Sequence, residues 1–401
     1  MGTSFNDIQG FIYPNEIELH WSILVVVYPY VTGLVAGAFI LASLVKVFKV
    51  KELQPVYRLA MLTALAFLLV APLPLLAHLG HPEKSFEIFL TPNTRSAMAM
   101  FGFVYAWYLM AVLLLEMWFD YRRDLILWAR KERGFTKFVH RVISLFSFDV
   151  SDRAIRFDRR AVQAITIIGI PSAFLLHGYV GFIFGSVKAN PWWSSVLMPI
   201  VFLFSAIVSG IALVLLIYMI VTPMRGSQID MSCLDRLASY LFYAMIVDFS
   251  LEILDFVHRI YESEESIEIL GQLVEGRLFV SLVVIQLLMG MVVPLIAIVV
   301  VKLFRFPAEL RRTLYFLSAI LVQVGIFSTR WNVVIGGQLF SKSLRGLTTY
   351  KMSILGIEGL LTAIAMLVLP LLILAVLLRI LPPWPEARNP EHPAPVTPAA
   401  T

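Results

Sequence analysis

Cysteine is almost absent from this chain, which has 401 residues and a single cysteine, Cys233. One thiol excludes an internal disulfide, a Cys-ligated iron–sulfur cluster and a Cys-rich zinc site within the chain. We therefore expect any iron–sulfur centre that works with this chain to belong to a partner.

Charged residues are also scarce: they make up 15% of the chain, whereas hydrophobic residues make up 59%. Soluble domains carry roughly 25% charged residues, so this chain has too few polar side chains to cover a globular surface. Its apolar runs of twenty or more residues are long enough to cross a hydrocarbon core of about 30 Å as helices. We predict an all-α integral membrane protein with about nine transmembrane helices, at residues 22–46, 57–80, 96–119, 162–186, 195–221, 238–258, 278–302, 313–334 and 353–379.

A small-residue cleavage site is absent after the first apolar run, which ends in Lys46, Lys49 and Lys51, so we expect an anchor and not a removable signal peptide. If the amino terminus is outside the cell, most of the 32 Lys and Arg residues lie on inner segments. This distribution predicts a cytoplasmic-membrane protein with its amino terminus outside and its carboxyl terminus inside. Orientation accounts for the basic residues, so nucleic acid is not an expected partner.

A faint internal repeat relates the two halves of the chain. The first span contains TGLVAGAFILASL and the fifth contains SAIVSGIALVLLI, and both place small residues one helical turn apart. We predict two four-helix bundles arranged as parallel repeats, with chance similarity between apolar segments as the alternative. The expected units are an extracytoplasmic segment 1–21, a first bundle 22–186 with a basic cytoplasmic loop 120–161, a second bundle 195–334, a ninth helix 353–379 and a disordered Pro-rich cytoplasmic tail 380–401.

The basic loop mixes Leu, Trp and Phe with Arg and Lys at helical spacing in LILWARKERGFTKFVHRVISLF. We expect this segment to lie along the inner headgroups, because basic amphipathic helices bind anionic lipid. Docking of a partner protein is the alternative.

Polar and ionisable side chains within the predicted spans gather toward the outer end. An ionised side chain at mid-membrane costs about 2.5–3.5 kcal/mol, so these groups should face one another. Glu252 and Asp255 share one helix face, and Arg330 is the expected countercharge. The set suits a quinone, because a quinol must form hydrogen bonds at both oxygens and lose protons as it is oxidised. The predicted quinone-binding residues, with His177 first and His78 second, are His20, Tyr28, His78, His177, Tyr179, Glu252, Asp255, Arg330 and Asn332.

Other carboxylates suggest a proton path. Glu116 and Asp120 lie four residues apart near the inner end of the third span, and we group them with Asp248 and Glu358. Structural ion pairs, satisfied histidines and, for Glu116 and Asp120, simple contact with water are the alternative explanations.

The segment HLGHPEKSFEIFLTPNTRSAMAMFGF at residues 78–103 resembles the NrfD family, the quinone-interacting membrane subunits of polysulfide reductase and related respiratory complexes. His78 and His81 stand where the family pattern has Asp and Arg. GLVAGAF in the first span also fits the family. The region FLSAILVQVGIFSTRWNVVIGG, followed by a helix ending in RILPP, is similar to longer members such as the membrane subunits of hydrogenase 2 and alternative complex III.

The resemblance implies a subunit that has no haem or iron–sulfur cluster and no catalytic centre of its own. Such a subunit exchanges electrons between menaquinone or ubiquinone and a ferredoxin-like iron–sulfur subunit on the extracytoplasmic side. A catalytic subunit beyond it carries molybdopterin or another centre. Proton translocation is a further hypothesis. Two other classes stay open: a haem-b cytochrome with His78 and His177 as ligands, and a secondary transporter.

Overall fold

The computed structural model describes residues 10–11, 17–262, 266–304 and 306–384. Within these ranges, nine helices are long and apolar enough to cross a membrane, which confirms the all-α membrane fold. The tail from residue 385 onward and most of the predicted amino-terminal segment fall outside the described residues. In chain order the elements are β1 (Gly10–Phe11), α1 (Leu24–Lys46), η3 (Lys51–Leu53), α2 (Gln54–Val70), α3 (Leu73–His78), η4 (Pro82–Lys84), α4 (Glu87–Leu90), α5 (Ala97–Trp107), η5 (Tyr108–Leu114), α6 (Leu115–Lys131), α7 (Phe135–Ile143), α8 (Asp152–Gly185), α9 (Met198–Met224), α10 (Met231–Glu262), α11 (Ile267–Gln272), η6 (Leu273–Arg277), η7 (Phe279–Val292), α12 (Val293–Leu303), α13 (Ala308–Val334), η8 (Gly336–Gln338), β2 (Arg345–Gly346) and α14 (Leu360–Ile380).

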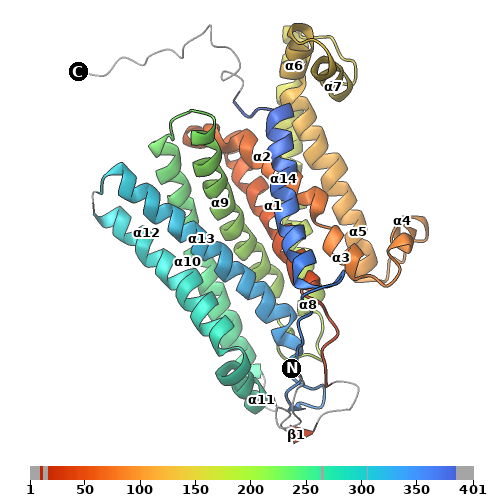
Figure 1. Cartoon of the computed structure of the whole chain (residues 1–401), viewed down its shortest axis with the longest axis vertical. Coiled ribbons are helices and arrows are strands. Elements are labelled where there is room, and N and C mark those ends of the chain that lie inside the picture. The colour runs from red at the N-terminus through yellow and green to blue at the C-terminus, as the bar shows by residue number, and fades with distance from the viewer. Residues whose placement is uncertain (1–9, 12–16, 263–265, 305, 385–401) are drawn as a thin grey trace.

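The long helices pack as two groups of four spans with one further helix. The first group contains α1, α2, α5–α6 and α8, and the second contains α9, α10, η7–α12 and α13. The helices α1 and α9 form the main contact between the groups, and α14 packs on α2. The strand β1 and the carboxyl end of α14 lie at opposite ends of the molecule (Figure 1), as an odd number of crossings requires. The short pair β1–β2 is antiparallel and lies at the same end as α11.

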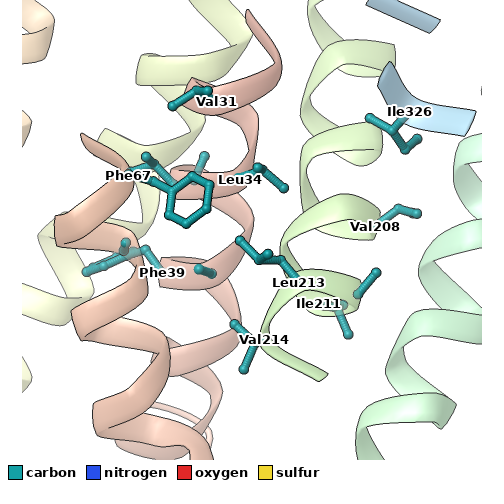
Figure 2. Packing of buried hydrophobic residues seen from close by; sticks show 14 of the residues in the cluster. Val31, Leu34, Phe39, Phe67, Val208, Ile211, Leu213, Val214 and Ile326 are labelled. Atoms are coloured by element: carbon teal, nitrogen blue, oxygen red, sulfur yellow. The ribbon is translucent and has the colours of Figure 1, made fainter. Parts of the chain in front are cut away.

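Backbones of α1 and α9 touch directly. A Cβ added at Gly210 would lie 2.4 Å from Gly37 Cα, and one added at Gly37 would lie 2.0 Å from the carbonyl oxygen of Ala206. Only glycine permits this approach, because any side chain would push the helices apart. Around this contact, apolar side chains of α1 and α9, including Leu34 and Leu213, fill the space between the groups (Figure 2).

The third and seventh spans each contain a π-helical stretch, η5 and η7 respectively. A π-helix changes the register of side chains along a helix and is frequent at functional sites. These two spans occupy the same place in the two groups of four, since each is the third of its group.

Three predicted boundaries are wrong. The helix α8 begins at Asp152 and not at residue 162, and α10 begins at Met231 and not at residue 238. Both helices continue past the apolar run, and the Ser151 hydroxyl caps α8 by accepting from the Ala154 amide at 3.3 Å. The ninth helix begins at Leu360 and not at residue 353, because residues 351–359 are irregular and Gly356 has a φ of +100°.

Candidate functional site

A buried contact between His177 of α8 and Arg330 of α13 joins the two groups of helices. Both side chains are 0% exposed. Arg330 Nη2 donates to His177 Nε2 at 3.2 Å and to Ser205 Oγ at 2.5 Å, while His177 Nδ1 lies 3.5 Å from Thr32 Oγ1. Because a guanidinium can only donate, His177 Nε2 accepts, and the imidazole is neutral with its proton on Nδ1. Both ring nitrogens of His177 are therefore engaged within the protein.

Two buried carboxylates of α10 face Arg330 without a direct ion pair. Neither oxygen of Asp248 has a hydrogen-bond partner among the described residues. Glu252 accepts from Gln286 Nε2 at 3.1 Å through one oxygen, and its other oxygen has no partner in the described part of the chain. Both carboxylates interact electrostatically with Arg330, so this guanidinium offsets part of their charge from a distance.

Asp255 is not paired with Arg330, and that prediction is wrong. Its carboxylate is bound instead by Arg259, one turn further along α10, and it accepts from the hydroxyl of Ser195. Arg259 also donates to the backbone carbonyl of Trp192. The spacing of four residues between Asp255 and Arg259 is visible in the sequence and favours this nearer partner.

A small cavity adjoins these groups in the second bundle. Its volume is about 70 Å³, and Glu252, Asp255, Gln286 and Asn332 supply polar lining. Asn332 donates to Gln286 Oε1 at 2.7 Å. A cavity of about 150 Å³ is needed to hold benzene, so a quinone ring does not fit this space. Gln286 is a polar contributor that sequence reasoning missed, because an uncharged amide in an apolar span gives little signal.

A second titratable pair lies at the outer end of the first bundle. His78 Nδ1 is 3.0 Å from Glu358 Oε1 and 3.2 Å from Ser22 Oγ, and the described contacts of His78 do not use Nε2. Apolar side chains next to the pair in sequence are exposed: Leu79 by 48% and Ile357 by 71%. Burial raises the pKa of Tyr350, which lies outside the spans, and the Glu358 carboxylate raises it further. The pair thus combines titratable groups with a surface suited to lipid. We call it the outer His–Glu pair.

The remaining predicted outer residues lie in two other places. Tyr28 and Tyr179 both contact Phe101, with ring centroids 5.6 and 6.1 Å apart. His20 lines an outer cavity of about 360 Å³ beside Trp193. The described contacts do not join these residues to His177, so the predicted set is divided among several locations.

At the inner end of the first bundle, Glu116 is buried and is not simply wet. Its Oε1 accepts from Thr166 at 2.8 Å and from Tyr57 at 3.3 Å. Asp120, one turn further along α6, forms ion pairs with Lys46 and Arg58. Glu116 is therefore linked to three spans, while Asp120 reaches the inner end of the bundle.

The geometry does not favour a haem. Both ring nitrogens of His177 are engaged by protein groups, which leaves none for an iron atom. Among the residues that the structure describes, no group of three or more His, Cys, Asp or Glu side chains is arranged to hold a metal ion.

Together, the fold and these buried polar groups define an all-helical, multi-spanning membrane protein. The chain belongs to the NrfD family: the family model described as "Polysulphide reductase, NrfD" matches residues 14–342. The C subunit of selenate reductase from Mesobacillus selenatarsenatis is 31% identical over 325 residues, which cover 79% of this chain and 73% of that protein. A putative C-type membrane subunit of dimethyl sulfoxide reductase from Halobacterium salinarum is 29% identical, over 55% of this chain and 48% of its own length. Protein NrfD of Escherichia coli is 26% identical, over 50% of this chain and 59% of its own length.

Proposed function

We propose that this chain is the quinone-interacting membrane subunit of a respiratory reductase complex. It exchanges electrons between the membrane quinone pool, menaquinone or ubiquinone, and a ferredoxin-like iron–sulfur subunit on the extracytoplasmic face. A catalytic subunit with molybdopterin or another centre lies beyond that partner. Membership of the NrfD family and the names of the relatives, which are subunits of selenate and dimethyl sulfoxide reductases, support this proposal.

The observation that carries the proposal is the outer His–Glu pair. A lipid-borne quinol needs an acceptor for its hydroxyl proton at a position that it can reach from the bilayer. His78 Nε2 is available, Nδ1 is backed by Glu358, and exposed apolar side chains flank both residues. The central His177 lacks these properties because it is fully buried. We therefore propose His78 for direct contact and His177 as a positioning residue.

The chemistry follows from this arrangement. When a quinol hydroxyl donates to His78 Nε2, the imidazole accepts the proton, and the Glu358 carboxylate stabilises the resulting cation. The side chain of Glu358 is 47% exposed, so it can pass a proton on to water at the outer surface. Each quinol oxidised in this way releases two protons and two electrons, and the electrons go to the iron–sulfur partner. Reduction of a quinone reverses every step.

The rest of the predicted set takes supporting roles. Tyr28, Tyr179 and His20 are proposed to shape the outer quinone region, while Glu252, Asp255, Arg330 and Asn332 form the polar interior of the second bundle. Glu116, Asp120 and Asp248 are proposed proton-carrying groups, because buried carboxylates with incomplete hydrogen bonding are suited to exchange protons.

The test is to replace His78 by Ala in the complex purified with its partner proteins. We expect quinol-linked turnover to fall at least tenfold while the iron content and the set of co-purifying proteins stay unchanged. His81→Ala is the matched control, because His81 is exposed and contacts only its neighbour Glu83 in the described structure. Normal quinol turnover in His78→Ala would refute the role of His78. Purification without any iron–sulfur protein would refute the proposed function as a whole.

A further inference from the structure

A cavity of about 380 Å³ opens at the inner ends of α6 and α8, and we call it the inner cavity. It shares only Asp120 with the groups assigned above. Its lining is strongly charged on the inner side and includes the aromatic ring of Phe119. The cavity lies at the end of the molecule from which α7 projects (Figure 1).

The carboxylates of the inner cavity are already neutralised. Asp120 forms ion pairs with Lys46 at 2.7 Å and Arg58 at 2.8 Å, and Asp124 pairs with Arg58 at 2.7 Å. These four side chains form one compensated network. They contribute no net charge to the cavity.

Cations at the rim of the inner cavity are left over from this compensation. Asp158 is bound by Arg122 through Nε and Nη2, at distances of 2.7–3.0 Å. Arg123 and Arg159 also line the cavity, and both are at least partly exposed. Within the described ranges, neither guanidinium has a hydrogen bond or ion pair, so the rim carries two positive charges that an anion can bind.

An apolar strip continues from the inner cavity along the outside of α6 and α8. The rings of Phe119 and Phe157 are in contact, with centroids 5.9 Å apart. Further toward the middle of the membrane, Leu115 is 44% exposed and Ile167 is 50% exposed. A charged opening therefore leads directly onto a surface that faces hydrocarbon.

We propose that the inner cavity binds an anionic phospholipid of the inner leaflet. The phosphate lies between Arg123 and Arg159, and the acyl chains follow the strip of Phe119, Phe157 and Ile167. Guanidinium groups bind phosphate through paired N–H donors, and basic pockets between transmembrane helices on the cytoplasmic side bind phospholipid headgroups. The apolar strip favours a lipid over free phosphate, because free phosphate would leave that surface unused.

The test compares the full purified chain with an Arg123→Gln/Arg159→Gln variant in detergent. Adding phosphatidylglycerol is expected to raise the melting temperature of the unmodified protein and to leave that of the variant unchanged. Lipid extraction is expected to show at least fivefold less retained anionic phospholipid in the variant. Arg156→Gln/Arg160→Gln is the matched control, since both residues are exposed on the same turns of α8 and do not line the cavity. This control should behave like the unmodified protein.

Two further arms keep the result decisive. Arg123→Lys/Arg159→Lys retains the charge and should recover most of the lipid response, which separates a loss of binding from a folding defect. Inorganic phosphate at millimolar concentration should not raise the melting temperature. An equal response to inorganic phosphate, or an unchanged lipid response in the Gln variant, would overturn the proposal.

Discussion

The guanidinium of Arg330 organises the centre of the protein at the scale of single residues. It fixes the tautomer of His177, contacts Ser205 and stacks over Phe202 with its central carbon 4.2 Å from the ring centroid. The sequence identifies Arg330 and His177 as costly groups that must be buried together. It does not identify them as direct partners, because a contact across 153 positions depends on how the spans are arranged and not on local spacing.

Arg122 and Asp158 provide a residue-scale prediction. Their ion pair is almost fully buried, with side chains 9% and 8% exposed. Replacing Arg122 by Met leaves Asp158 as an uncompensated charge, which typically costs about 3–5 kcal/mol. We expect the melting temperature of the purified protein to fall clearly in Arg122→Met and to recover substantially in Arg122→Met/Asp158→Leu. Equal melting temperatures for both variants and the unmodified protein would show that the pair does not contribute to stability.

At the scale of elements, hydropathy predicted where helices cross the hydrocarbon but not where they end. The helix α8 begins at Asp152, well before its predicted start, since charged residues outside the membrane continue a helix without any apolar signal. The helices α7 and η5 were not predicted for a similar reason. Neither interfacial helices nor a change from α to π geometry alters the mean hydropathy of a segment.

The position of α7 depends on one side chain that links three helices. His140 of α7 contacts Glu132, just after α6, through Nδ1 at 2.7 Å, and the carbonyl oxygen of Ile380 in α14 through Nε2 at 3.0 Å. We expect His140→Ala to increase amide hydrogen exchange in residues 135–146 without affecting α1 or α9. Lys137→Ala, on an exposed position of the same helix, is the control. Unchanged exchange in His140→Ala would mean that apolar contacts alone hold α7.

For the whole molecule, the sequence predicts which end faces outward, and labelling can test it. Cys233 is 0% exposed, so it should not react in the folded protein. We expect a membrane-impermeant maleimide to label Lys188→Cys, between α8 and α9, in intact cells or spheroplasts. Arg133→Cys, between α6 and α7, should react only after the membrane is opened. The reverse pattern would invert the predicted orientation and move the outer His–Glu pair to the cytoplasmic side.

The glycine contact between α1 and α9 bears on how the protein can work. Alternating access requires one half of a transporter to rock against the other, and that motion needs side chains that can slide or repack at the pivot. Gly37 and Gly210 offer no such freedom, because main chain rests on main chain. The protein is better suited to act as a static frame, in which electrons and protons move while the helices stay in place.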